Sequence, residues 1–305
     1  MYHCIKTLVR NVTTATIRHM RPADLAEVTS LTEKESWNLS QEVVRTLYEY
    51  CPEGSFIAEL QGKVVGAIMG FNMNEEESFG GMWVVSKQHR GQRIGTMLLQ
   101  RIKEHIGDRN IGIFSVAESV EAHKRFGFTV ESWKICHVSG IIATEKIKLA
   151  EDCMVHVCAF PSRHVQFDDL FQYDTKIHSV ERERFLRVWT QGKSTITLVA
   201  IGRTGEIVGY GVIKRDSNDT VVGPIYGETP SVMKTLLVSL ISKTTFGENI
   251  NMSVPVESEI LQELLVENKS TLKVLSEETR MFFHHEVKAP LEKIFAIASS
   301  EAGHC

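Results

Sequence analysis

The stretch WVVSKQHRGQRIGT, residues 83–96, joins a strand, a basic loop and the start of a helix within fourteen residues. Apolar residues at 79–85 predict a strand, and apolar residues at the spacing of one helix face predict a helix over 96–106. Helix N-termini present unpaired N–H groups and a positive dipole end, and Gly91 and Gly95 let the backbone approach a ligand closely. The stretch therefore predicts a cradle for a phosphate-bearing ligand.

The charge of the chain is concentrated around this loop. The 305 residues carry a formal net charge of −4, yet residues 87–109 hold six basic and two acidic side chains, a local charge of +4 that leaves −8 for the rest. Because the whole chain lacks a basic excess, nucleic acid is not an expected partner. From the spacing alone an alternative stays open, in which the glycines serve only a tight turn and the arginines form a solvated surface.

The composition indicates a globular protein of two domains. Hydrophobic residues make up 43% and charged residues 24% of the chain, which excludes extended disorder and a single small module. Six cysteines without a C-x-x-C pair indicate reduced thiols and no metal site. The N-terminus has no apolar core of signal-peptide length and no window approaches the length of a membrane span, so we expect a cytoplasmic protein without a membrane partner.

A short internal repeat supports two related halves. The sequence GKVVG at 62–66 reappears as GEIVG at 205–209, 143 residues further along, and each copy follows a strand-like apolar stretch. Each copy is typical of a hairpin turn, although a chance match of so short a pattern stays open. Both halves alternate predicted strands and helices and end with predicted strands, at 128–138 and 280–285. The sequence thus predicts two mixed α/β domains that pack together.

The loop resembles motif A of the GNAT N-acetyltransferase superfamily. Arg90 and Gly95 match the pattern as they stand, the Gly91-Gln92 pair and Ile94 fit its common R-G-Q-x-I-G form, and Arg93 stands where the family usually has its middle glycine.

A second segment, AHKRFGF at 122–128, resembles the end of motif B. Counting back from the final Gly-Phe, His123 takes the place of the family's tyrosine general acid and Arg125 that of its lysine. An imidazole can protonate a leaving thiolate. The alternative for His123 is a surface histidine on an amphipathic helix.

The resemblance implies acetyl-CoA as the co-substrate and no metal. Its pyrophosphate would lie on the loop, and its pantetheine arm would lie along the strand that ends at residue 85. The residues assigned to the coenzyme are Trp83, Val84, Val85, Arg90, Gly91, Gln92, Arg93, Ile94, Gly95, Thr96 and Arg125.

The second half is similar to the degenerate C-terminal domain of tandem GNAT proteins, on residues 223–228, 254–255 and 280–281. It lacks the R-x-x-G-x-G pattern and has Glu228 in the corresponding loop, so we expect no acetyl-CoA there. The resemblance implies two GNAT-like domains, each a twisted, mixed, mostly antiparallel sheet flanked by helices. Residues 1–146 would hold the acetyl-CoA site, and residues 147–305 would bind substrate or cover the cleft of the first domain.

The acceptor amine must lose a proton before it attacks, because only the neutral amine has a lone pair, so the expected reaction also calls for a base. Glu118 is the first candidate, with Glu76 and His137 behind it. A cysteine nucleophile at Cys136, or at 153 or 158, is an alternative, but inert thiols fit better because these cysteines lie in apolar stretches.

The expected function is transfer of an acetyl group from acetyl-CoA to a small-molecule or amino-acid-like amine, by direct attack in a ternary complex. A peptide or protein N-acetyltransferase and an acyl-CoA sensor without turnover are the alternatives. The sequence leaves a homodimer open.

Overall fold

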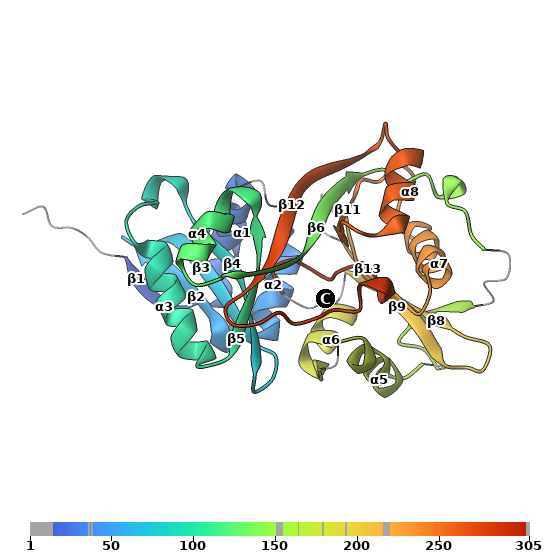
Figure 1. Cartoon of the computed structure of the whole chain (residues 1–305), viewed down its shortest axis with the longest axis horizontal. Coiled ribbons are helices and arrows are strands. Elements are labelled where there is room, and N and C mark those ends of the chain that lie inside the picture. Colours follow the sequence, from blue (N-terminus) through green and yellow to red (C-terminus); the bar gives the residue numbers. More distant parts are fainter. Residues whose placement is uncertain are drawn as a thin grey trace, which may run out of the picture.

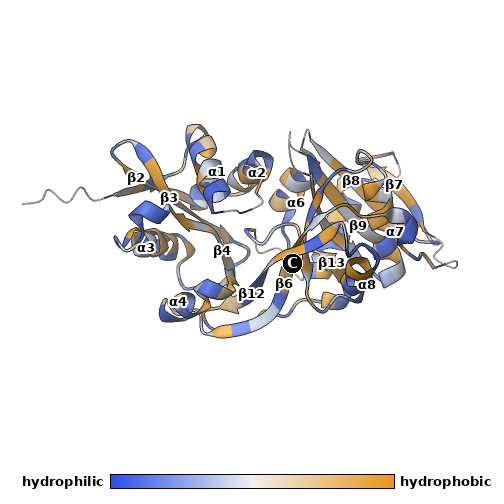
Figure 2. Cartoon of the chain, turned by 90° about the horizontal axis from the view of Figure 1, so that it is seen from above, coloured by the Kyte–Doolittle hydropathy of each residue, from blue (hydrophilic) through white to orange (hydrophobic). Residues whose placement is uncertain are grey.

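The first half of the chain forms strands covered by helices on both sides. The computed structural model describes residues 15–302 except 36, 38, 151–154, 164, 179, 193 and 216–219. The elements of this half are β1 (Thr16–His19), α1 (Leu25–Lys34), α2 (Gln41–Tyr50), β2 (Ser55–Leu60), β3 (Lys63–Asn72), β4 (Glu77–Val85), α3 (Ile94–Ile106), β5 (Asn110–Val116), α4 (Val120–Arg125) and β6 (Val130–Gly140). Helices α1 and α2 lie on one side of the strands, and α3 and α4 lie on the other (Figure 2).

The second half repeats this order of elements. They are β7 (His156–Phe160), α5 (Phe167–His178), α6 (Glu183–Thr190), β8 (Thr195–Ile201), β9 (Ile207–Arg215), β10 (Thr220–Gly227), α7 (Pro230–Ile241), β11 (Ile250–Pro255), α8 (Glu259–Glu267) and β12 (Leu272–Phe282), followed by β13 (Ile294–Ala296). The repeated motif forms the hairpins β2–β3 and β8–β9, whose turns contain Gly62 and Gly205 at positive φ. Among the described strand pairs only β4–β5 and β10–β11 are parallel. The expected mixed, mostly antiparallel architecture is confirmed.

The two halves exchange their last long strands. All strands belong to one sheet in the order β1-β2-β3-β4-β5-β12-β6-β11-β10-β9-β8-β7, with β13 paired to β10. Strands β1 to β6 of the first half correspond in element order to β7 to β12 of the second half. When each strand is exchanged for its counterpart, the strand order read from the opposite edge of the sheet is unchanged. Strands β6 and β12 therefore lie side by side at a pseudo-twofold centre (Figure 1). The division into residues 1–146 and 147–305 stays a prediction, and the structure places β12 between β5 and β6.

The sequence prediction was incomplete at the end of the second half. β12 begins at Leu272 rather than at residue 280, and β13 was not predicted. The first seven residues of β12 have one buried side chain, so no apolar alternation marks them as a strand. Part of the strand predicted near 154–160 lies outside the described residues, and β7 covers the rest.

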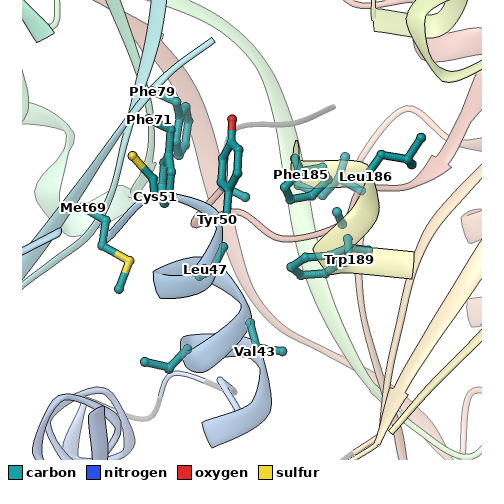
Figure 3. Packing of buried hydrophobic residues seen from close by; sticks show 14 of the residues in the cluster. Val43, Leu47, Tyr50, Cys51, Met69, Phe71, Phe79, Phe185, Leu186 and Trp189 are labelled. Atoms are coloured by element: carbon teal, nitrogen blue, oxygen red, sulfur yellow. The ribbon is translucent and has the colours of Figure 1, made fainter. Parts of the chain in front are cut away.

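Helices α2 and α6 pack against each other between the halves. Tyr50 of α2 stacks on Phe71 with ring centroids 5.2 Å apart, and it meets Phe185 of α6 edge-on at 5.3 Å (Figure 3). Trp189 stacks on Phe185 at 5.2 Å and is buried. One apolar cluster therefore runs from the α1 and α2 side of the first half to α5 and α6 of the second.

Within the described residues, none of the helices is both long enough and apolar enough to cross a membrane. The same part of the chain contains no group of three His, Cys, Asp or Glu side chains that could hold a metal ion.

Candidate active site

Strand β4 precedes the basic loop and α3 in the chain, strand β5 follows them, and the two strands separate along their length. β4 and β5 are parallel neighbours only where residues 77–79 pair with residues 110–112. Further on, β5 pairs with β12, and in the described structure residues 80–85 of β4 have no strand partner on this side. Free backbone N–H and C=O groups on a strand edge can bind another extended chain that carries amides. One edge of β4 is thus open beside the basic loop.

The loop turns through left-handed backbone before α3 begins. Gly91 has φ +77° and Arg93 has φ +65°. The helix begins at Ile94, two residues earlier than predicted, because Arg93 already directs the chain into it. Arg93 adopts a conformation that glycine reaches easily and that costs another residue about 1 kcal/mol. The arginine therefore preserves the turn at the position where the resemblance expects a glycine.

The basic side chains of the loop are held loosely. The Arg90 Nε–H donates to the Val85 carbonyl at 3.0 Å, and its Nη2 lies 2.7 Å from the Glu35 carboxylate. Lys87 Nζ lies 3.8 Å from the same carboxylate. The Arg90 side chain is 52% exposed and that of Glu35 11% exposed, and an ion pair whose cation is this open to solvent contributes about 1 kcal/mol. An incoming phosphate can therefore compete with Glu35 for both cations.

Trp83 connects β4 to the first turn of α3 and to α4. Its Nε1–H donates to the Gly95 carbonyl at 3.2 Å, and its ring stacks on His123 with centroids 5.2 Å apart. A Cβ added at Gly95 would lie 3.5 Å from Trp83 Nε1, which is an ordinary contact. The Trp83 side chain thus holds the first turn of α3 and helix α4 against β4. Its backbone is part of the open edge of β4.

His123 is a neutral imidazole in this structure. Its Nδ1 lies 2.7 Å from the Ser115 hydroxyl, and burial lowers its pKa to about 4. At neutral pH it can donate an N–H hydrogen bond, but only about one ring in a thousand carries a second proton. Its role as the acid stays a prediction, and the lowered pKa favours a neutral ring over a charged one.

The other sequence-predicted residues are spread over the first half. Glu118 is exposed in the short turn before α4, and Arg125 is exposed at the end of that helix. Glu76 is exposed at the end of β4 away from the basic loop. Gln92 and Thr96 are exposed beside Gly91, while Ile94 and Val84 are buried. The structure brings the loop residues together and leaves Glu118 and Glu76 outside that group.

Strand β4 contains a bulge that the sequence did not reveal. Ala67 pairs with Val84 and Met69 with Gly81, so Met82 and Trp83 oppose a single residue of β3. Met82 has φ +53°, and its N–H donates to the carboxylate of Glu301 near the C-terminal end. A Cβ at Gly81 would lie 2.0 Å from the Glu301 carbonyl oxygen, so the close approach requires glycine there. The end of the second half thus reaches the open strand of the first.

Four polar side chains meet at this point, and we call them the central cluster: His137, Ser253, Glu278 and Glu301. His137 of β6 has Nδ1 at 2.9 Å from the Ser253 hydroxyl and Nε2 at 3.2 Å from the Glu278 carboxylate. Burial acts to lower the pKa of His137, but the hydrogen bond and charge of Glu278 outweigh it and raise the pKa. The sequence named His137 as a candidate base, and the structure pairs it with a carboxylate of β12.

Glu301 is a half-buried carboxyl group with an altered acidity. Burial and the neighbouring Glu278 charge raise its pKa, the Met82 N–H and His137 lower it, and the result is about 7. A carboxylate with this pKa can accept a proton at neutral pH. The local sequence around residue 301 shows no motif, so only the fold could reveal this group.

The corresponding edge of the second half is occupied. β10 and β11 pair only at residues 220–221 with residues 250–251 and then separate as β4 and β5 do. β13 pairs with β10 beyond that point, through Ile225 with Ala296 and Tyr226 with Ile294. In the loop that follows, Glu228 forms an ion pair with Lys293 at 2.8 Å. In the second half, β13 thus covers the edge of β10 that corresponds to the open edge of β4 in the first half.

Two of the described cysteines are poor nucleophiles. Burial raises the pKa of Cys51 to about 12 and that of Cys136 to about 11, so both thiols stay protonated at neutral pH. Cys158 is a half-buried free thiol, and Cys153 lies outside the described residues.

Comparison with known proteins identifies each half. An acetyltransferase (GNAT) family model matches residues 24–128, and an acetyltransferase (GNAT) domain model matches residues 170–296. The holothin acyltransferase of Pseudoalteromonas sp. (strain SANK 73390) is 23% identical over 287 residues, covering 93% of this chain and 94% of that protein.

Solved structures share the whole fold. A putative acetyltransferase from Pyrococcus horikoshii superposes with a TM-score of 0.75 at 19% identity, covering 99% of this chain and 100% of its own. A tandem GNAT protein from the clavulanic acid biosynthesis pathway gives 0.61 at 10% identity, covering 88% and 98%. With matching models in both halves and an acyltransferase relative along nearly its full length, the chain belongs to the GNAT acyltransferase family as a tandem protein with two GNAT domains.

Proposed function

We propose that the protein transfers an acetyl group from acetyl-CoA to the amine of a small molecule, with the donor bound in the first half. The observation that carries this proposal is the open edge of β4 next to the basic loop, set against the edge of β10 that β13 occupies. The first half combines a basic loop with an open strand edge, whereas in the described part of the second half β13 occupies that edge and Glu228 lies in the corresponding loop.

The loop and the start of α3 would bind the pyrophosphate through Arg90 and the N–H groups of residues 93–96. The pantetheine arm would lie along residues 83–85, and the Met82 N–H at the bulge would polarise the thioester carbonyl. The amine then attacks the carbonyl carbon directly. With Nδ1 accepting the Ser115 hydroxyl proton, His123 would donate its Nε2–H as a hydrogen bond to the departing sulfur.

The packing around the bulge favours a compact acceptor. Met82 and Ala302 are completely buried, in one apolar cluster with side chains of α2, α6 and the C-terminal segment. A relative along almost the whole chain is named for the acylation of one compound, holothin. Both observations support a small acceptor over a long peptide.

The proposal is tested by titration calorimetry with acetyl-CoA, followed by a thiol-release assay over a panel of small amines and peptides, with longer acyl-CoA donors in parallel. We expect saturable binding and release with small amines. Binding without release on any acceptor would support a sensor, release with peptides alone would support a peptide acetyltransferase, and no binding of acetyl-CoA would refute all three.

Replacing His123 with Gln should lower kcat about tenfold and leave acetyl-CoA binding intact, because only one hydrogen bond to the sulfur is lost. The lowered pKa also predicts that the wild-type rate shows no decline between pH 6 and 7 from loss of a His123 proton. A rate–pH profile measured with both proteins checks this, and a falling limb near pH 6.5 that disappears in H123Q would assign the role of proton donor to a charged His123.

A further inference from the structure

The C-terminal segment places a carboxylate on the backbone group that the donor requires. Glu301 accepts the Met82 N–H, although the two residues are 219 positions apart. Met82 packs its side chain with Ile297 and Ala302 on the α1 and α2 side of the sheet, while Trp83 packs with the α3 side. Glu301 therefore approaches the bulge from the side opposite the basic loop.

This contact cannot persist when the donor binds as proposed above. The Met82 N–H can serve either the Glu301 carboxylate or the thioester oxygen, and a buried N–H with two competing acceptors bonds to one at full strength. A thioester oxygen bonded to Met82 would displace the carboxylate from this N–H. The displaced carboxylate would stay close to the carbonyl carbon, on the α1 and α2 side of the sheet.

We propose that Glu301 is the catalytic base of the acyl transfer and that the bound acyl-CoA releases it from Met82 for this role. The inference rests on the proposed function. The Glu301 carboxylate takes a proton from the acceptor nitrogen as the nitrogen–carbon bond forms, and the carbonyl electron pair moves to the oxygen held by Met82. When the pair returns, the carbon–sulfur bond breaks, CoA leaves as a thiolate that takes a proton from solvent, and Glu301 returns its proton to solvent.

The surroundings of Glu301 suit a group that must hold and release one proton. The titratable side chains that face it are Glu278 of β12 and His137 of β6. The Glu278 charge raises the pKa of Glu301, and the Met82 hydrogen bond lowers it. Loss of that hydrogen bond in the donor complex therefore makes the carboxylate more basic. His137, bound to Ser253 and Glu278, is a positioning residue that keeps Glu278 in place.

The first test replaces Glu301 with Gln, which keeps the size of the side chain and the oxygen that accepts the Met82 N–H. We expect kcat to fall about 100-fold, with the Kd for acetyl-CoA changed less than about twofold. The wild-type kcat/KM should rise with pH through about 7, because the base must be unprotonated, and this limb should be absent in E301Q. In the wild type the rise of kcat with pH should occur at a higher pH than the rise of kcat/KM, because the bound donor removes the Met82 hydrogen bond and makes Glu301 more basic.

The exposed Glu292, nine positions earlier in the same segment, provides a matched control. E292Q should retain the wild-type rate and profile. Ionisation of the acceptor amine is common to all three proteins, so the ratio of wild-type to E301Q rates isolates Glu301.

Folding of the variant is checked by thermal melting. The folded-state pKa of Glu301 lies above the ordinary 4.5, so its ionisation destabilises the fold as the pH rises from about 4.5 to about 7. E301Q removes this effect and should melt at or above the wild-type temperature at pH 8.

Replacing Glu301 with Ala tests the release step. E301A should bind acetyl-CoA about fivefold more tightly than the wild type at pH 8, since no carboxylate competes for Met82. CoA, which has no acyl oxygen, should bind both proteins equally.

Four outcomes decide the inference. An undiminished rate in E301Q, while the wild type turns over acetyl-CoA, overturns the role of Glu301 and leaves the acyltransferase function standing. A reduced rate with the pH limb still present also overturns it, since the loss is then structural. Equal acetyl-CoA affinity in E301A and wild type overturns the release step. A wild type that binds no acetyl-CoA overturns the proposed function and this inference with it.

Discussion

Replacing Arg90 with Glu and Gly95 with Asp in one chain is expected to weaken acetyl-CoA binding about 1,000-fold, or about 4 kcal/mol. R90E removes the cation nearest the predicted pyrophosphate and adds a carboxylate beside Glu35. G95D places a second carboxylate in the first turn of α3, where the helix N–H groups should face the phosphates. A Cβ fits at Gly95, so the double variant should fold.

Titration calorimetry with acetyl-CoA measures the loss. The second half supplies a control of equal charge, because Ser231 is the second residue of α7 as Gly95 is of α3, and Lys269 is exposed. The pair S231D and K269E should leave binding unchanged. If the control pair loses affinity to the same degree, or R90E with G95D retains it, the loop is not the anion site.

Replacing Asp174 with Ala is expected to lower the free energy of unfolding by about 3–5 kcal/mol. Asp174 of α5 is completely buried and accepts hydrogen bonds from Arg182 Nε and Nη2, both at 2.7 Å, and from the Tyr210 hydroxyl at 2.5 Å. Without Asp174 the guanidinium group remains buried with no compensating charge. Arg182 Nη1 is already a buried nitrogen without a hydrogen-bond partner in the described structure, so little can replace the lost contacts.

Urea unfolding followed by tryptophan fluorescence measures this loss. The double variant D174L and R182M replaces the pair by apolar side chains of similar volume and should recover most of the lost stability. A D174A protein as stable as the wild type would show that the buried pair contributes nothing to folding. Because α5 and α6 belong to the same apolar cluster as Met82 of β4, we also expect D174A to lose activity at a lower urea concentration than the wild type.

The basic loop could be predicted from sequence because its signal is local. The glycines, the basic side chains and the apolar helix positions lie within about thirty residues, and helix spacing and helix-end chemistry act over that range. The repeated hairpin likewise predicted two related halves. Even the departure at Arg93 is local, since φ +65° at that residue alone preserves the turn.

The central cluster could not be predicted because its members are brought together by pairing between the halves. His137 meets Glu278 only because β12 lies next to β6, and Glu301 reaches Met82 only because the segment after β13 continues across the sheet. Register between strands more than a hundred residues apart leaves no periodicity in either strand. The sequence therefore suggested Glu118, which is close along the chain, and missed Glu301.

The exchange of β6 and β12 also sets the order in which the protein can mature during synthesis. The first half emerges from the ribosome first, but the place between β5 and β6 stays empty until residues 272–282 have been made. Until then, two strand edges and the apolar side chains beside them have no neighbour, and the carboxylate at residue 301 is not yet part of the chain. A nascent chain that ends before residue 272 thus contains the whole basic loop but lacks the strand that joins β5 to β6, so the continuity of the sheet depends on residues translated long after the loop.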